Sequence, residues 1–404
     1  GQPLLLTHRG QAVSDEWEQR LRRLLAALDS DGNSAFGLTV LSNADAALNP
    51  FAGLDRDQGE PDGAICEQLV QLLGAGELHE LEQWPAHLVL LSPAAVEILA
   101  RQDTTRGNAA RRLRAAGGRL LVTDRLFLHE PEQDLFKREQ LEAHEERRPA
   151  PWGILSERLD HWLRKVSLEA GSETAMQLAR FARAEAPISL HITHSWGGGV
   201  AQWIASFIDA DDSGINLQLR SEGPQKDAGT GQRFSLYLAN QTVAPIASWW
   251  LQPPIQSTAA NNESYRELLQ GVTTQYRAGR LVVSSLIGHS LDALTTGLPT
   301  IQVLHDFYPR WPLLGIHPGP YLRENQPADL ARAMQDHRLL DELSDRDAAA
   351  WETLGTRWRE NVVNWGVHLA APSRSVADLM RQLDPAWSDI EFEIIPHGLP
   401  ELPG

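Results

Sequence analysis

The sequence has few of the residues that mark secreted, membrane-spanning or nucleic-acid-binding proteins. Among its 404 residues there is one cysteine, Cys66, which excludes an intramolecular disulfide and favours a reducing compartment. No apolar run approaches the roughly 20 residues that span a bilayer. Lys and Arg number 36 against 53 Asp and Glu, a net charge of −17, and binding nucleic-acid phosphates needs clustered cations. The sequence therefore predicts a cytoplasmic protein that has no nucleic-acid partner.

Two segments, a basic cluster and the first ten residues, need separate consideration as a nucleic-acid-binding site and a signal peptide. The one basic cluster, RRLRAAGGR at 111–119, is typical of the solvent-exposed face of a helix. The first ten residues, GQPLLLTHRG, have neither the charged flank nor the long apolar core of a signal peptide. No initiator methionine precedes them, and we therefore expect the chain to be part of a longer one.

The order of predicted strands and helices changes along the chain. Residues 1–150 mix strand-like and helix-like segments, and the charged, proline-bearing EERRPAPW at 145–152 is the best linker candidate. Two helices are predicted within 151–186. From 187 to 404, strands and helices alternate, which is typical of a doubly wound parallel sheet. We expect an α/β protein with domains over 1–150 and 187–404, joined by a helical linker.

The stretch ITHSWGGGV, residues 192–200, ends an apolar strand with polar residues and three consecutive glycines. Ligands of open parallel sheets bind at the carboxyl ends of the strands, where the strand order switches. His194 is therefore a candidate ligand-binding residue. Gly197, Gly198 and Gly199 permit two interpretations: they allow close packing of strand and helix, or they bare backbone N–H groups for a phosphate at the helix N-terminus.

Three more predicted strand ends carry polar groups, at 284–289, 305–306 and 373. Four such ends on one edge favour a binding crevice, with Ser285, His289 and Ser373 as candidates for binding substrate or phosphate. His305 and Asp306 are the catalytic candidates, because a histidine that ends a buried strand is placed to donate a hydrogen bond or exchange a proton. The alternative is that this pair caps a helix.

Other site types fit less well. His191 and His194 lie three residues apart on a strand and point to opposite faces, so we expect no shared metal. GGGVAQW lacks the third glycine of the dinucleotide fingerprint, although Glu222 lies at a tolerable distance for a ribose contact. The G-x-S-x-G elbow of serine hydrolases is missing from the sequence.

Four separated motifs of 187–404 resemble, in this order, the N-terminal domain of family 4 glycosyltransferases: ITHSWGGGVAQWI, VVSSLIGHSLDALTTGLPTIQVLHDFYP, AAPSRSVADLM and EIIPHGLP. These bacterial enzymes build O-antigen and related surface polysaccharides. The resemblance implies the two-Rossmann GT-B fold, a nucleotide-sugar donor, retention of anomeric configuration, and no metal or other cofactor. It also implies that the glycine-rich loop faces the donor phosphates and that His305 lies against the reacting sugar.

The same resemblance sets expectations about partners. The PHG step, with His397 and Gly398 as binding candidates, leads in that family into the donor-binding domain, whereas this chain ends six residues later. We therefore expect this chain alone to be inactive. Its partners would be a nucleotide sugar, a glycan or lipid-linked glycan acceptor, and an assembly complex at the inner membrane. The alternative is a non-catalytic scaffold or glycan-binding subunit of such a complex.

Residues 1–150 resemble, more faintly, the second half of a family 2 (GT-A) glycosyltransferase. THRG at 7–10 stands where that family carries Asp-x-Asp, and TTRGNAAR at 104–111 stands where it carries an acidic base. Histidine and arginine cannot replace a carboxylate pair around a hard cation. We expect this module to be catalytically inactive and to bind no nucleotide sugar with a metal.

Overall fold

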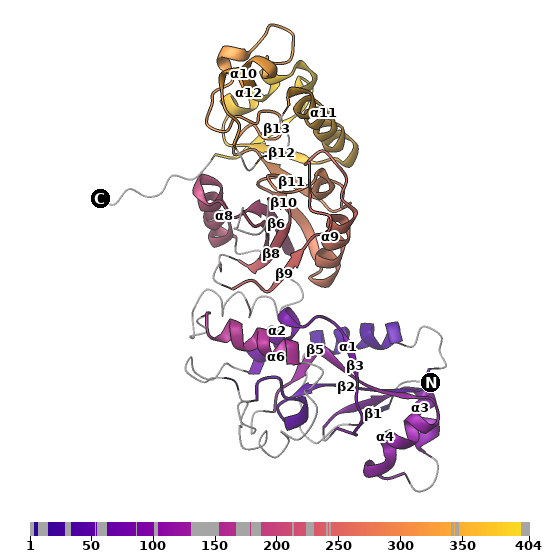
Figure 1. The fold of residues 1–404 in the computed structure, drawn as a ribbon. Coiled ribbons are helices and arrows are strands. Elements are labelled where there is room, and N and C mark those ends of the chain that lie inside the picture. Colours follow the sequence, from indigo (N-terminus) through magenta and orange to yellow (C-terminus); the bar gives the residue numbers. More distant parts are fainter. Residues whose placement is uncertain are drawn as a thin grey trace, which may run out of the picture. The chain divides into compact units, whose positions relative to one another are not determined.

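The chain divides into two units, Gly1–Glu185 and Ala186–Gly404, each described by itself (Figure 1). The computed structural model describes residues 4–6, 15–28, 34–52, 54, 63–85, 87–100, 104–130, 153–166, 178, 187–211, 214–223, 230–239, 241, 244–340, 343 and 347–396. None of the helices within these ranges is both long enough and apolar enough to cross a bilayer. The fold is α/β, with two mixed sheets that contain parallel strands.

The first unit is built on a five-stranded sheet in the order β1-β4-β2-β5-β3. Strands β2 and β5 pair in parallel, and the remaining pairs are antiparallel. Its elements are β1 (Leu4–Leu6), α1 (Asp15–Leu28), β2 (Phe36–Ser42), η1 (Ala46–Leu48), α2 (Gly63–Leu73), β3 (Leu78–Glu80), β4 (Val89–Leu91), α3 (Pro93–Leu99), α4 (Arg106–Ala115), β5 (Arg119–Leu128) and α6 (Gly153–Leu163).

The amphipathic helix α1 covers part of this sheet. Trp17 and Leu21 are buried in one cluster with residues of β2, β4 and β5, and the Trp17 indole N–H donates to the carbonyl oxygen of Phe127 (3.2 Å). The helical spacing of these apolar residues thus places them on the face of α1 that packs against the sheet.

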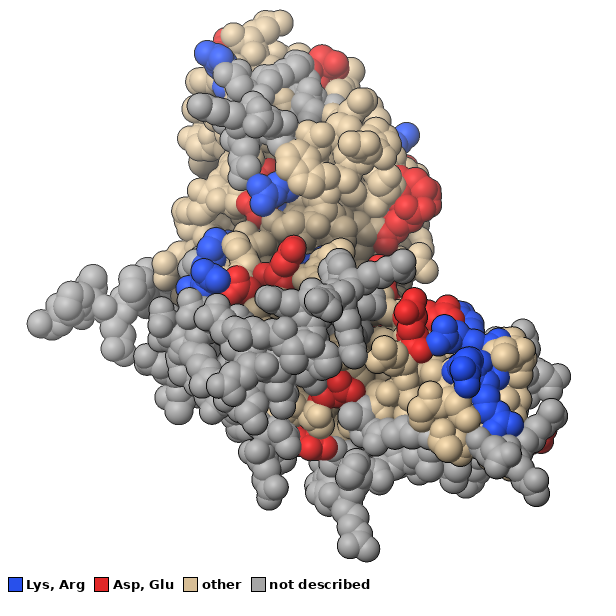
Figure 2. Space-filling model, turned by 60° about the horizontal axis from the view of Figure 1, so that its bottom comes forward, with Lys and Arg blue, Asp and Glu red and all other residues tan. Residues whose placement is uncertain are grey.

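Helix α4 carries two motifs named above, TTRGNAAR at 104–111 and the basic cluster. TTRGNAAR forms its N-terminus, where the Thr105 N–H donates to Asn108 Oδ1 (2.9 Å). Arg111 and Arg114 are exposed, which confirms that the basic cluster is a solvent-exposed helix face. On the face shown in Figure 2, basic side chains lie in small groups among acidic and uncharged residues.

Helix α6 belongs to the first unit. Its buried face packs against α2, and the Arg158 guanidinium donates to the carbonyl oxygen of Leu73 (3.0 Å). From the sequence, this helix was expected to lie in a linker over 151–186. Within that range the structure describes only 153–166 and Leu178, and THRG and EERRPAPW lie outside the described residues.

The second unit is built on an eight-stranded sheet in the order β13-β12-β11-β10-β6-β7-β8-β9. Its elements are β6 (Ile188–His194), α8 (Gly198–Ala210), β7 (Ile215–Ser221), β8 (Arg233–Leu238), β9 (Ala247–Trp250), α9 (Glu263–Gln275), β10 (Ala278–Val283), η2 (Leu291–Leu294), β11 (Thr300–Val303), η3 (Gly319–Tyr321), α10 (Leu330–Asp336), α11 (Ala348–Trp365), β12 (His368–Ala371), α12 (Arg374–Leu383), η4 (Pro385–Trp387) and β13 (Phe392–Ile394).

The prediction of a wholly parallel sheet is wrong at one edge. The strands from β13 to β7 are parallel, but β8 pairs antiparallel with β7, and β9 pairs antiparallel with β8. The connections β7–β8 and β8–β9 are too short for the dozen or more residues that a parallel crossover needs.

Helices cover both faces of this sheet (Figure 1). On one face, the ring of His191 meets Phe207 of α8, with ring centroids 5.5 Å apart. On the other, the Trp358 indole N–H of α11 donates to Gln302 Oε1 (2.8 Å). Trp365, in the last turn of α11 before Gly366, is 52 % exposed.

The strand order reverses at the centre of the sheet. From β6 the chain passes through α8 to β7 on one side, and it later returns to place β10 on the other side of β6. The carboxyl ends of β6 and β10 therefore flank a topological switch point, where open α/β sheets bind their ligands.

Candidate functional site

Three glycines connect β6 to α8 at this switch point. Gly197 and Gly198 have φ of 78° and 73°, a region that glycine adopts without strain. A Cβ atom added at Gly197, Gly198 or Gly199 would meet no heavy atom within 4 Å. Close strand–helix packing therefore does not explain these glycines, and the first interpretation is excluded. The backbone requires the first two, and the space beside all three is open.

Two buried hydroxyls lie at the neighbouring strand ends. Thr193 precedes the last residue of β6, and Ser284 directly follows β10, where its N–H donates to the Ile192 carbonyl (2.9 Å). Their side chains are only 2 % and 5 % exposed, and within the described residues neither Oγ has a hydrogen-bond partner. Buried hydroxyls normally have partners, so these two are available to a bound ligand.

A fixed cation occupies the carboxyl end of β7. Arg220 is aligned with Thr193 of β6, and its guanidinium donates two hydrogen bonds to Gln218 Oε1 (2.9 and 3.2 Å). The guanidinium also lies over the ring of Tyr237, 4.8 Å from its centroid. The Tyr237 hydroxyl donates to Glu222 Oε1 (3.1 Å). These contacts hold the positive charge of Arg220 in one place beside β6.

The sequence analysis missed Arg220 and Tyr237 and considered Glu222 only as a ribose contact. The signal for Arg220 was a lone arginine in INLQLRS, a strand with buried residues on both faces. The signal for Tyr237 was weaker, because its contact with Arg220 depends on the register of an antiparallel pair.

His194 lies at the end of β6 as predicted. Its Nδ1 accepts a hydrogen bond from the Trp196 N–H (3.2 Å), and its ring lies 5.0 Å from that of Trp196. Burial, together with the charge of Arg220, lowers the pKa of His194 to about 4. The ring is therefore neutral at pH 7 with its proton on Nε2, which makes it a hydrogen-bond donor.

His289 is a core residue. It is fully buried, its Nε2–H donates to the Thr193 carbonyl (2.7 Å), and its Nδ1 accepts from the Tyr265 hydroxyl (2.6 Å). Both ring nitrogens are thus used inside the protein. This leaves His289 no ring nitrogen for a ligand, and its role in this structure is to join β6 to α9.

His305 and Asp306 follow β11. The ring of His305 meets the ring of Trp203, on α8, edge to face at 4.9 Å. Asp306 Oδ1 accepts from the Tyr308 N–H (2.9 Å), and burial raises the pKa of this carboxyl. No helix begins at this pair, and the helix-capping alternative is therefore wrong. Asp306 closes a turn, and His305 packs against the helix that begins at the glycine turn.

Two other candidates make local contacts. Ser373 is the N-cap of α12: its Oγ accepts from the Val376 N–H (3.3 Å) and lies 2.8 Å from Ser375 Oγ. Ser285 Oγ accepts from the Ile287 N–H (3.2 Å). Both hydroxyls thus stabilise the backbone around them. His397 and Gly398 lie outside the described residues.

We expect the substitution Ser373→Ala to separate capping from ligand binding. Loss of the cap should lower the free energy of unfolding by about 1 kcal/mol. Binding at the glycine turn should not change, because the hydroxyl is already used by α12. Urea unfolding and ligand titration of the same variant test both statements. If Ser373→Ala lost ligand binding without losing stability, Ser373 would be a ligand-binding residue rather than a helix cap.

Within the described ranges, no group of three or more His, Cys, Asp or Glu side chains is arranged to hold a metal ion. Comparisons with models of known protein families, with curated proteins and with solved structures gave no match.

Proposed function

We propose that the second unit binds the phosphate groups of a nucleotide sugar at the glycine turn and takes part in retaining glycosyl transfer to a bacterial surface glycan. The observation that carries this proposal is the glycine turn itself. Three residues without side chains stand at the N-terminus of a 13-residue helix, beside open space and at the switch point of the sheet. Helix N-termini of this kind are favourable sites for phosphate.

The surrounding groups suit an anion that carries several oxygens. The free N–H groups of the first turn of α8 and the guanidinium of Arg220 supply positive potential. Thr193 and Ser284 supply hydroxyl donors, and neutral His194 supplies its Nε2–H. In this proposal the sugar extends toward β11, where His305 and Asp306 act on it.

The proposal extends to the fold family, the partners and the location. The second unit would be the acceptor-side half of a GT-B enzyme, and the first unit a catalytically inactive GT-A-like module. The acceptor would be a glycan or lipid-linked glycan of an assembly complex at the inner membrane.

Isothermal titration of the full chain with UDP-, GDP- and CMP-sugars tests this proposal. We expect saturable binding of at least one of them. Arg220→Gln should weaken it by about 10- to 100-fold, because a charge-assisted hydrogen bond contributes about 1.5–3 kcal/mol. The matched control is Arg280→Gln, because Arg280 lies near the amino end of β10 and pairs with Asp211.

Equal weakening by the two arginine variants would contradict a phosphate site at the glycine turn. Binding of a glycan with no affinity for any of these nucleotide sugars would instead favour the alternative, a non-catalytic glycan-binding subunit.

A further inference from the structure

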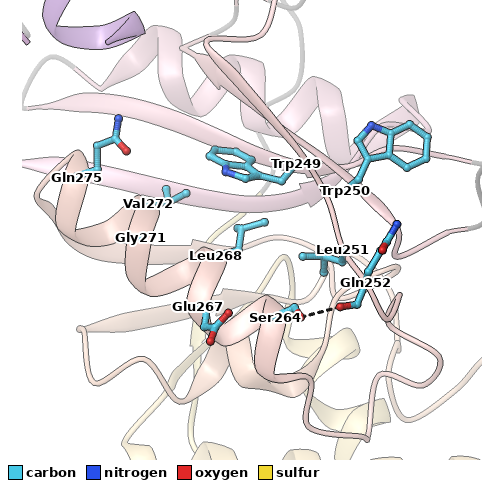
Figure 3. Close-up of a pocket in the computed structure, with 10 residues that line it drawn as sticks. All are labelled: Trp249, Trp250, Leu251, Gln252, Ser264, Glu267, Leu268, Gly271, Val272 and Gln275. Carbon is cyan, nitrogen blue, oxygen red and sulfur yellow. Dashed lines mark hydrogen bonds between the residues drawn. The ribbon is translucent and has the colours of Figure 1, made fainter. Parts of the chain in front are cut away.

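A second concave surface of this unit lies at the opposite side of β7 and β8 from the switch point. It is a groove of about 490 Å³ between the edge strand β9 and helix α9 (Figure 3). This volume is in the range of about 300–1,000 Å³ that is usual for small-molecule sites. Its lining shares no residue with the glycine turn: Trp249, Trp250, Leu251, Gln252, Ser264, Glu267, Leu268, Gly271, Val272 and Gln275.

One wall of the groove is a single face of α9. Ser264, Glu267, Gly271 and Gln275 follow one another at helical spacing and therefore share that face. Opposite them lies Trp249 of β9, above Leu268 and Val272 in Figure 3. The groove thus combines an indole face and apolar side chains with a carboxylate, an amide and a hydroxyl.

Several polar groups of the groove are free to bind a ligand. Glu267 and Gln252 are exposed, and their side chains make no hydrogen bond to any described residue. Figure 3 shows Gln252 and Gln275 at the two ends of the groove. At the rim, Trp250 is 53 % exposed. The exposed Trp250, the half-buried Trp249 and these unused hydrogen-bonding groups together give the groove apolar surface and polar groups that a ligand can use.

Gly271 supports the same conclusion. A glycine inside a helix is destabilising relative to alanine. A Cβ atom at Gly271 would meet nothing within 4 Å, and packing therefore does not require the glycine. Because Gly271 has no side chain, the space between this part of α9 and the edge strand β9 stays open.

We propose that this groove binds neutral sugar units of a glycan. The apolar C–H face of a pyranose ring would stack on the Trp249 indole, while its hydroxyls donate to Glu267 and exchange hydrogen bonds with Gln252. The lining holds no Lys or Arg, which disfavours a phosphate or another anion. An added peptide strand is disfavoured because β9 has four residues and leads into Pro253 and Pro254, which have no N–H to donate.

The site stands independently of the proposed nucleotide-sugar site, and the experiment keeps the two apart. The probes are neutral oligosaccharides of glucose, galactose, mannose, rhamnose and N-acetylglucosamine, titrated into the full chain and followed by tryptophan fluorescence and calorimetry. We expect saturable binding of at least one probe. Arg220→Gln should leave that binding unchanged, whereas it weakens binding of nucleotide sugars.

Two variants place the sugar in the groove. Trp249→Ala should weaken binding about tenfold, since stacking on an aromatic ring is lost. Gly271→Met should do the same while the melting temperature stays at or above that of the parent, because methionine favours helix and fills the groove. The control is Trp365→Ala, which removes an exposed tryptophan of α11 that does not line the groove.

The proposal is overturned if none of the oligosaccharides binds, or if Gly271→Met binds them as tightly as the parent. Competition of the bound sugar by an extended peptide, with backbone hydrogen bonding to β9 detected by amide exchange, would also overturn it in favour of strand addition.

Discussion

Lowering the pH from 7.5 to 5 is expected to destabilise the second unit, and its two fully buried histidines contribute about 4 kcal/mol of that loss, because burial opposes their protonation in the folded protein. His194, whose pKa is also lowered to about 4, adds to the loss. His191 and His289 are both 0 % exposed, and burial lowers the pKa of each to about 4. The Nδ1 of His289 accepts a hydrogen bond, which requires the neutral ring, whereas the bond of His191 to Asn216 raises the pKa of His191 and offsets burial only in part. His191 binds Asn216 Oδ1 (2.9 Å), and His289 joins Thr193 to Tyr265.

The sign of this pH dependence follows from the pKa values of the histidines in the folded and the unfolded protein. In the unfolded chain a histidine has a pKa of about 6.5, whereas these two have a pKa of about 4 when folded. Between these values the unfolded state binds more protons, so stability falls as the pH falls from 6.5 toward 4. At pH 5 the difference is about 1.5 pKa units, or about 2 kcal/mol for each histidine. Asp306 acts in the opposite direction, because burial raises the pKa of its carboxyl.

Urea unfolding at pH 7.5 and pH 5, followed by tryptophan fluorescence, measures the loss. His289→Gln isolates one contribution: this variant should be less stable than the parent at pH 7.5 but should lose about 2 kcal/mol less on acidification. The control is His368→Gln, since His368 is exposed. If His289→Gln and the parent lost equal stability between the two pH values, the buried neutral histidine would not explain the pH dependence.

The strands of the second unit were predictable where apolar residues recur along them. In Ile188–His194 apolar and polar residues alternate and all but His194 are buried, and Thr300–Val303 is buried except at Ile301. Strand β9 was missed because Ala247–Trp250 has four residues and follows a polar segment. Its antiparallel partner β8 was predicted to be a strand, but its direction in the sheet was not predicted. The direction depends on the length of the connections between strands, and the alternation of strands and helices in the sequence does not reveal that length.

The candidate site was predictable only in part, for a related reason. The glycine turn is local, and ITHSWGGGV is sufficient to place it between β6 and α8. The neighbours of the turn come from pairing between strands: Arg220 reaches it through the register of β6 with β7. His289 illustrates the converse. Its position after a strand suggested a ligand, but Tyr265 of α9, 24 residues earlier, occupies its Nδ1.

The second large effect concerns His305. Under the proposed function, we expect His305→Ala, in this chain joined to a donor-binding domain, to lower the turnover of sugar transfer by about 100- to 1000-fold. His305 lies two residues after the end of β11, and the edge-to-face contact of its ring with Trp203 at 4.9 Å holds it against α8. A donor held in this way needs no reorganisation during the reaction. A hydrogen bond that strengthens as charge develops on the sugar therefore accelerates the transfer step.

Turnover and melting temperature are compared for His305→Ala, the unsubstituted protein and Ser373→Ala, each joined to the donor-binding domain, with the nucleotide sugar that binds best in titration as donor. Ser373→Ala is the matched control, because it should melt earlier and yet transfer sugar at the parental rate. His305→Ala should show the reverse pattern, a large loss of turnover with a small change in melting temperature. If His305→Ala instead melts earlier and retains near-parental turnover, its ring supports only the packing of α8, and the reacting sugar must lie elsewhere along the carboxyl edge of the sheet.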